Sequence, residues 1–218
     1  MGQLIEGTWY DEWYDTSATK GRFVRTEAQF RNQIKNNSEF KPQVGRYHLY
    51  VSLACPWAHR TLIFLKLKGL EDLIDVTVVD PDMLENGWSF STEDPDPVAG
   101  HQFLHQVYTS AIPDYTGRVT VPVLWDKELK TIVNNESSEI IRIFNSAFNA
   151  VTGNTLDFYP PQYHTQIDDW NEYIYPRINN GVYRAGFATT QSAYEEAFRD
   201  VFEALDRIEA HLESNRYL

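Results

Sequence analysis

Cysteine is almost absent from this sequence, whose 218 residues contain a single one, Cys55. One cysteine excludes a disulfide within the chain and any zinc site built from several thiolates, which favours a reducing, cytoplasmic compartment. No apolar run approaches the roughly 20 residues that a membrane-spanning helix needs. Residues 1–6 show neither the basic nor the apolar region of a secretory signal. These absences predict a cytoplasmic protein with no membrane partner.

Positive charge is also scarce. Lys and Arg number 19 against 31 Asp and Glu, which gives a net charge of −12. A surface of that sign repels phosphate backbones and anionic lipid, so no nucleic-acid partner is expected. Hydrophobic residues make up 42% and charged residues 23%, an ordinary composition for a folded protein. A small molecule is therefore the expected partner.

The first half of the chain follows the pattern of an α/β domain. Residues 47–51 and 75–79 predict strands on either side of a helix that Pro56 opens, a β-α-β unit with parallel strands. Residues 80–118 are rich in Pro, Gly and Asp and are expected to be loop-rich. Two further strands are expected over 121–125 and 131–133. The helix expected from Glu136 has an apolar face, formed by Ile140, Ile141, Ile143, Phe144, Ala147 and Phe148.

The second half is helical in pattern, after a linker over 153–161. Pro176 is expected to kink or end the first helix, whose apolar stripe consists of Ile167, Trp170, Ile174 and Ile178. Ser192 and Glu195 are expected to form a capping box for the second. Its stripe consists of Phe198, Val201, Phe202, Leu205, Ile208 and Leu212. The chain is thus expected to contain an arm over 1–44, a thioredoxin-like α/β domain over 45–150 and an all-α domain beginning at 161 and reaching 218.

Cys55 and Pro56 lie where a predicted strand meets a predicted helix. The backbone N–H groups and the dipole at a helix N-terminus favour the thiolate over the thiol. A lone cysteine is more often a small buried apolar residue. The strand–Cys–Pro–helix context, with Val121-Pro122 downstream, favours a reactive thiol instead. We therefore predict that Cys55 is a nucleophile.

Several sequence blocks are specific enough to indicate a family. Ala54-Cys55-Pro56-Trp57-Ala58-His59-Arg60 resembles the signature of the glutathionyl-hydroquinone reductases, also called Xi-class glutathione transferases. Further matching blocks are residues 45–50, 83–88, 117–126, 135–137 and 179–188. The resemblance implies a thioredoxin-like glutathione-binding domain followed by an all-helical domain, with glutathione as co-substrate. It also implies a homodimer.

The activity that the resemblance implies is the reduction of S-glutathionyl-hydroquinones. Cys55 would attack the sulfur of the conjugate, releasing the hydroquinone and leaving a mixed disulfide with glutathione. A second glutathione would then resolve that disulfide. One cysteine suffices for this scheme, because the resolving thiol comes from solution.

Glutathione itself is expected to bind at two segments. Glu136 and Ser137 begin a helix, where N–H groups and a hydroxyl can hold the γ-glutamyl carboxylate and a carboxylate can accept from its ammonium. A simple helix cap is the alternative for this pair. Val121 precedes a proline that the family fold implies to be cis, and its backbone would pair with the cysteinyl part of glutathione. The resemblance assigns Arg118, Val119 and Thr120 to the same segment.

Two aromatic residues complete the expected site. The resemblance implies that Trp88 covers the tripeptide and that Tyr183 donates a proton to the departing hydroquinone. Packing within the fold is the alternative for each. His101 and His105 have the spacing of metal ligands, but Gln102 stands where a zinc hydrolase motif needs glutamate, so no metal site is expected.

Two other functions share these residues. An omega-like thioltransferase or dehydroascorbate reductase would use the same Cys55 and glutathione site. A non-enzymatic interaction module of transferase-like fold would not need a thiolate, which argues against it.

The position of the last residue carries a separate expectation. The resemblance implies that further helices follow the position at which this sequence stops, Leu218, so we expect a truncated C-terminal domain. The apolar stripe over 198–212 would then be exposed, and the hydroquinone site would be incomplete.

Overall fold

The computed structural model describes residues 2–218, which divide into two compact units. The first unit consists of Met1–Trp13 and Ala28–Phe158, and the second of Tyr14–Glu27 and Tyr159–Leu218. Residues 1–44, predicted to form an arm, therefore contribute to both units.

A mixed sheet of four strands, in the order β4-β3-β6-β7, is the centre of the first unit. Its members are β3 (Tyr47–Val51), β4 (Ile74–Val78), β6 (Val123–Asp126) and β7 (Thr131–Asn134). β3 and β4 pair in parallel, as the β-α-β pattern predicts, and β6 is antiparallel to both β3 and β7. All of β3 is buried, which explains its unbroken run of aromatic and apolar residues.

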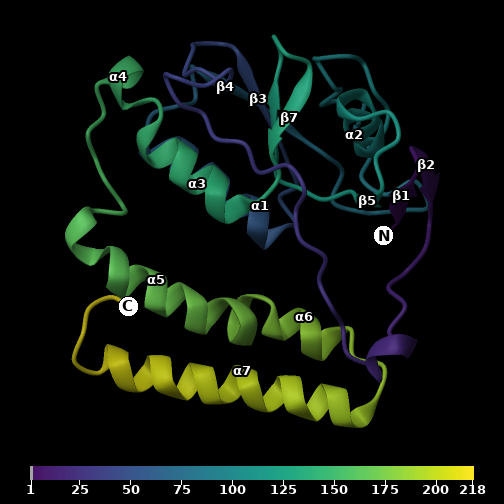
Figure 1. Ribbon diagram of the computed structural model, residues 1–218, viewed down its shortest axis with the longest axis vertical. Helices are drawn as coiled ribbons and strands as arrows, with labels where there is room; N and C mark the ends of the chain where they lie inside the picture. The colour runs from purple at the N-terminus through teal and green to yellow at the C-terminus, as the bar shows by residue number, and fades with distance from the viewer. Residues whose placement is uncertain (1) are drawn as a thin grey trace. The chain divides into compact units, whose positions relative to one another are not determined.

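Helices cover both faces of this sheet. α1 (Pro56–Leu67) and α3 (Ser137–Ser146) lie together on one side, and α2 (Leu104–Ala111) lies on the other (Figure 1). A short helix, α4 (Asn149–Thr152), follows α3. α3 buries Ile140, Ile143 and Phe144, as its apolar periodicity predicts. This is a thioredoxin-like domain, and the predicted α/β fold is confirmed.

Helix α2 lies within the segment expected to be loop-rich, where no helix was predicted for residues 104–111. Leu104, Val107 and Tyr108 are fully or almost fully buried and form the inner face of the helix. The Gln106 side chain accepts hydrogen bonds from the backbone N–H groups of Gln102 and Phe103, at 2.9 and 3.0 Å. The helix is short and flanked by loops, which is why its periodicity is weak in the sequence.

The N-terminal residues form a hairpin that was not predicted. β1 (Gln3–Ile5) pairs with β2 (Thr8–Tyr10) and with β5 (Gly117–Arg118) in a second sheet. Both turn residues have positive φ, 48° at Glu6 and 76° at Gly7, as in a tight I′-type hairpin turn. β5 leads directly into residues 119–121, so the hairpin supports a segment that is predicted to bind glutathione.

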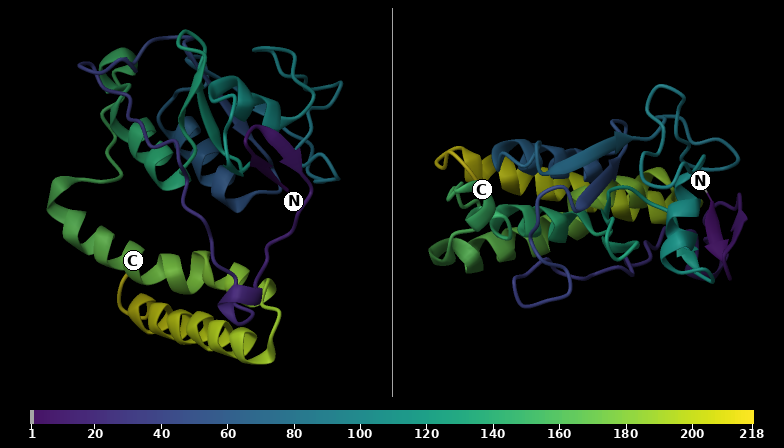
Figure 2. Two further views of the ribbon diagram at one scale, coloured as in Figure 1. Left: turned by 45° about the vertical axis from the view of Figure 1, so that its right-hand side comes forward. Right: turned by 90° about the horizontal axis from the view of Figure 1, so that it is seen from above.

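The second unit is all-helical. It contains η1 (Ser17–Thr19), η2 (Pro161–Tyr163), α5 (His164–Ile174), the π-helical turn η3 (Tyr175–Asn179), α6 (Gly181–Gly186) and α7 (Gln191–Leu212). α5 ends before Pro176, as predicted. α7 runs alongside η3 and α6 (Figure 2). Gly181 permits this approach, because a Cβ there would lie 2.9 Å from Val201 Cγ2.

Helix α7 differs from its prediction in two respects. Its N-cap is Thr190, whose Oγ1 accepts from Ala193 N at 3.4 Å, so the capping box at Ser192 and Glu195 is wrong. The predicted apolar stripe is also divided between two faces. Val201 is buried with Ala193, Ala197 and Ala204, whereas Phe198, Phe202, Leu205 and Leu212 are 41–50% exposed.

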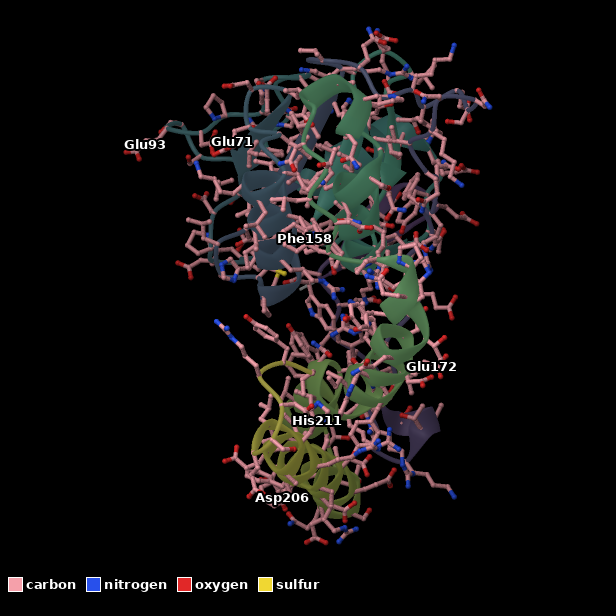
Figure 3. All side chains as sticks on the ribbon, turned by 90° about the vertical axis from the view of Figure 1, so that its left-hand side faces the viewer. Glu71, Glu93, Phe158, Glu172, Asp206 and His211 are labelled. Atoms are coloured by element: carbon pink, nitrogen blue, oxygen red, sulfur yellow. The ribbon has the colours of Figure 1, made fainter. Side chains whose placement is uncertain are left out.

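The helices of the second unit also carry exposed acidic side chains. Glu172 on α5 and Asp206 on α7 are both exposed (Figure 3).

Over residues 2–218, none of the helices combines the length and the apolar character needed to cross a membrane.

Candidate active site

Cys55 is the N-cap residue of α1, with extended backbone angles (φ −101°, ψ 113°). Its N–H donates to Ser52 O at 3.1 Å, and its own C=O accepts from His59 N at 3.0 Å. The side chain is half-buried. Pro56 has no N–H to satisfy at the first helical position, so the chain enters the helix directly after the thiol. The predicted placement of Cys55 at a helix N-terminus is confirmed.

The Cys55 thiol lies beside the backbone of Val121. It donates a hydrogen bond to the Val121 carbonyl oxygen, with an Sγ···O distance of 3.6 Å. The Val121–Pro122 peptide bond is cis, as the resemblance implies. The side chains of Val119 and Val121 are each 5% exposed and belong to the core. The fold therefore brings the predicted nucleophile to the backbone segment that is predicted to pair with glutathione.

Tyr108 of α2 holds this segment in place. Its hydroxyl donates to Thr120 O at 2.9 Å and accepts from Thr120 N at 3.2 Å. It also accepts from Asn135 Nδ2 at 3.1 Å, immediately before Glu136. Burial raises the pKa of the Tyr108 phenol, so the proton that it donates is retained. One buried hydroxyl thus links the two segments that are predicted to bind glutathione.

Glu136 is the N-cap of α3. Its carboxylate accepts from Ser138 N at 3.0 Å and from Ser138 Oγ at 2.9 Å. Ser137 is 3% exposed and begins the helix. The structure thus shows Glu136 capping α3, which is the alternative role considered for it. It leaves the second carboxylate oxygen for another donor, since a carboxylate can accept several hydrogen bonds.

Arg60 of α1 joins the two helix N-termini. Its Nε and Nη2 donate to Ser137 Oγ at 3.0 and 2.7 Å, and Nη2 lies 3.6 Å from Glu136 Oε1. Because Ser137 Oγ accepts these bonds, its own proton is available to an anion. Sequence reasoning gave Arg60 no role, although it ends the motif around Cys55. The only signal was a basic residue close to the predicted nucleophile in an acidic chain.

Arg118 and Trp88, both expected to contact glutathione, have side chains that are engaged within the first unit. Arg118 donates to the backbone carbonyls of Glu12 and Trp13 at 2.6 and 3.2 Å, so its guanidinium fixes the N-terminal segment. Trp88 is 9% exposed and belongs to the core cluster, which leaves little of the indole to face a ligand.

Tyr183 lies on α6, in the second unit. Its side chain is half-buried, and its ring contacts that of Phe187 edge to face at 5.8 Å. The guanidinium carbon of Arg25 lies 4.6 Å from the centroid of the Tyr183 ring. Arg25 is a second residue to which sequence reasoning gave no role.

The two histidines considered as metal ligands have other contacts. His101 Nε2 lies 3.0 Å from Ser110 Oγ. The His105 ring is stacked on Trp9 at 4.9 Å and on Phe103 at 5.4 Å. Throughout the described chain, no group of His, Cys, Asp and Glu residues is arranged to hold a metal ion.

Comparison with known proteins identifies relatives over the full chain. A family model described as glutathione S-transferase, N-terminal domain, matches residues 54–147. Glutathionyl-hydroquinone reductase YqjG of Escherichia coli (strain K12) is 55% identical over 230 residues, covering 100% of this chain and 70% of that protein. Glutathionyl-hydroquinone reductase PcpF of Sphingobium chlorophenolicum is 54% identical over 221 residues, again covering 100% and 70%.

A solved structure supports the same relationship. The glutathione-bound structure of YqjG, a glutathione transferase homolog from Escherichia coli K-12, superposes with a TM-score of 0.88 at 50% identity. The superposition covers 100% of this chain and 68% of that one. The chain is therefore similar in sequence and fold to glutathionyl-hydroquinone reductases, and it spans about 70% of their length.

Proposed function

Because this chain belongs to the glutathionyl-hydroquinone reductase family of glutathione transferases, we propose that it reduces S-glutathionyl-hydroquinones to hydroquinones at the expense of glutathione. The observation that carries the proposal is the contact between Cys55 Sγ and Val121 O, 3.6 Å apart. A glutathione whose cysteinyl part paired with the Val121 backbone would hold its sulfur beside that of Cys55.

The first half-reaction transfers glutathione to the enzyme. The Cys55 thiolate attacks the thioether sulfur, a new S–S bond forms and the S–C bond to the ring breaks. The electron pair of that bond passes to the ring carbon, which takes up a proton. Tyr183 is the proposed donor of that proton. The products are the free hydroquinone and a mixed disulfide between Cys55 and glutathione.

The second half-reaction regenerates the enzyme. A second glutathione, as the thiolate, attacks the mixed disulfide, and glutathione disulfide leaves. Cys55 returns to the thiolate, and the proton of the second glutathione replaces the one given to the ring. Glutathione is thus a co-substrate consumed in each turnover.

The α3 N-terminus is the proposed site for the γ-glutamyl end of glutathione. Ser137 would donate to its carboxylate, and the positive charge of Arg60 nearby favours an anion. Glu136 would accept from the γ-glutamyl ammonium through the oxygen that does not cap the helix. Val121 would pair through its backbone, with Arg118, Val119 and Thr120 in the same segment. Arg118 would act there through its backbone, since its guanidinium holds the N-terminal segment. Trp88 would cover the tripeptide only with the small part of its surface that is exposed. The homodimer that the resemblance implies, and the cytoplasmic location expected from the cysteine content, are part of the same proposal.

A comparison of substrates separates this function from its alternative. A glutathionyl-hydroquinone, a glutathione mixed disulfide and dehydroascorbate are each supplied with glutathione, and kcat/KM is measured for all three. We expect the highest value for the conjugate. A higher value for the disulfide or for dehydroascorbate would favour the omega-like reading, and no turnover of any of them would contradict the proposed chemistry.

Replacing Glu136 tests the glutathione site. Glu136→Gln keeps an oxygen to cap Ser138 N but removes the charge that would face the γ-glutamyl ammonium. We expect the Kd for glutathione to rise by about 10- to 100-fold, the range for losing a hydrogen bond to a charged group. Calorimetry measures the affinity, and a thermal melt should show almost unchanged stability. Wild-type affinity in Glu136→Gln would leave Glu136 as a helix cap alone.

A further inference from the structure

The N-terminal segment Tyr14–Glu27 is bound to the helices of the second unit by several hydrogen bonds. Thr16 Oγ1 lies 2.6 Å from Thr189 Oγ1, and Thr189 N donates to Gly21 O at 3.0 Å. Thr190 Oγ1 donates to Lys20 O at 3.1 Å. These contacts join the segment to the loop between α6 and α7.

Aromatic rings from both sides pack where the segment meets α6. Phe23 contacts Phe187 edge to face at 5.2 Å, and Tyr14 contacts Phe23 at 4.6 Å. Phe187 in turn contacts Tyr183. Phe23 is 4% exposed, whereas Phe187 and Tyr183 are half-buried, so Phe23 is the buried end of this aromatic cluster.

Arg25 enters this cluster with its charge over the Tyr183 ring. Its Cζ is 4.6 Å from the Tyr183 centroid and 5.6 Å from that of Phe23. Its Nε donates to Asn180 Oδ1 at 2.8 Å. Asn180 immediately precedes α6, three residues before Tyr183, so the guanidinium is held by the same helix that carries the phenol.

We infer that Arg25 is a positioning residue for Tyr183, which holds the phenol ring and makes its hydroxyl a stronger acid. This inference rests on the proposed function, in which Tyr183 protonates the departing ring. A cation over an aromatic face is attracted to the ring, and the attraction grows when the ring carries the negative charge of a phenolate. Arg25 therefore stabilises the product of proton transfer more than the reactant.

The first half-reaction leaves a negative charge on Tyr183, which a cation such as Arg25 would stabilise. As the S–C bond breaks, its electron pair moves to the ring carbon and the Tyr183 proton follows it. A phenolate remains on the enzyme until the proton of the second glutathione neutralises it. In a chain with a net charge of −12, a nearby guanidinium offsets this transient negative charge.

Single-turnover release of hydroquinone across pH tests the inference. We expect Arg25→Gln to slow release by about 3- to 30-fold at neutral pH. The basic limb of the pH profile should also move to higher pH, because the phenol ionises less readily without the cation. Arg25→Lys keeps a charge but loses the planar stack, and should recover part of the rate with a basic limb close to that of the wild type.

Arg22→Gln is the matched control. Arg22 lies on the same segment and pairs with Glu196 at 2.7 Å, but its side chain is 49% exposed. If the segment only needs to be fastened to the helices, Arg22→Gln and Arg25→Gln should act alike, and the inference is overturned. Asn180→Ala removes the Nε acceptor without touching the charge, and should cause a smaller loss of rate. If Arg25→Gln does not fold, Asn180→Ala provides the test, and a wild-type rate in Asn180→Ala would then overturn the inference.

Combination with Tyr183→Phe separates the inference from the proposed function. Tyr183→Phe should slow release on its own, and adding Arg25→Gln should then have no further effect, because the cation acts through the phenol. If Tyr183→Phe releases hydroquinone at the wild-type rate, the acid role of Tyr183 fails and the inference with it. If Tyr183→Phe is slow but Arg25→Gln alone is as fast as wild type, only the Arg25 inference is overturned. An equal effect of Arg25→Gln in both backgrounds also overturns it.

Discussion

Cys55→Ser will reduce a glutathionyl-hydroquinone more than about 1,000-fold more slowly than the wild type. A serine hydroxyl is not ionised near neutral pH, so it is a far weaker nucleophile toward sulfur than a thiolate. It also cannot form the mixed disulfide from which the second glutathione releases the enzyme. Steady-state release of hydroquinone, measured on wild type and variant at equal protein concentration, gives the loss.

The control for this prediction is His59→Gln. His59 is one helical turn beyond Cys55 and is exposed on α1, and the scheme gives it no part. We expect His59→Gln to turn over like the wild type. Cys55→Ser should still bind glutathione, since the proposed contacts at Val121, Glu136 and Ser137 remain. A Cys55→Ser variant with turnover near that of the wild type would contradict the covalent mechanism.

Asp126→Ala will lower the free energy of unfolding by about 3–5 kcal/mol, the cost of leaving one charge of a buried ion pair without its partner. Asp126 Oδ2 accepts from Nε and Nη2 of Arg46 at 2.8 and 2.5 Å. The two side chains are 0% and 5% exposed. Asp126 Oδ1 also accepts from Glu128 N and Leu129 N, so the carboxylate fixes the turn between β6 and β7. Urea denaturation followed by circular dichroism measures the change.

An exposed ion pair in the same unit is the control. Lys127 Nζ lies 2.9 Å from Asp75 Oδ2, and the Asp75 side chain is 68% exposed. Asp75→Ala should cost less than about 1 kcal/mol, because solvent screens the pair. Equal effects of the two variants would show that burial of the Arg46–Asp126 pair does not matter. A double variant, Arg46→Met with Asp126→Ala, should be less destabilised than Asp126→Ala alone, since no charge is left buried.

The central sheet could be predicted because its signals are local. Strand β3 is a run of aromatic and branched residues, and α1 opens with Pro56 after the single cysteine. The N-terminal hairpin could not be predicted in the same way. β1 and β2 have three residues each, and β1 depends on β5, more than 100 positions away, for its second partner. Helix α2 was hidden by the Pro- and Gly-rich loops around it.

The same distinction holds for the candidate site. Cys55, Val121, Glu136 and Ser137 each lie at a helix start or beside a proline, so their motifs carry the signal. Arg60 and Tyr108 matter through contacts made across the fold, and Arg60 meets Ser137 from 77 positions away. Nothing in the sequence around Arg25 indicates that its guanidinium lies over the ring of Tyr183. Such roles depend on tertiary packing, which short sequence patterns do not encode.

Intact-mass spectrometry of the protein mixed with one equivalent of a glutathionyl-hydroquinone, without free glutathione, tests the central claim most directly. The account predicts that the protein gains the mass of one glutathione on Cys55 while an equal amount of free hydroquinone appears in solution. Added glutathione should then remove the adduct and yield glutathione disulfide. An unmodified protein with the conjugate intact would contradict the account, and so would hydroquinone release from Cys55→Ser at the same rate.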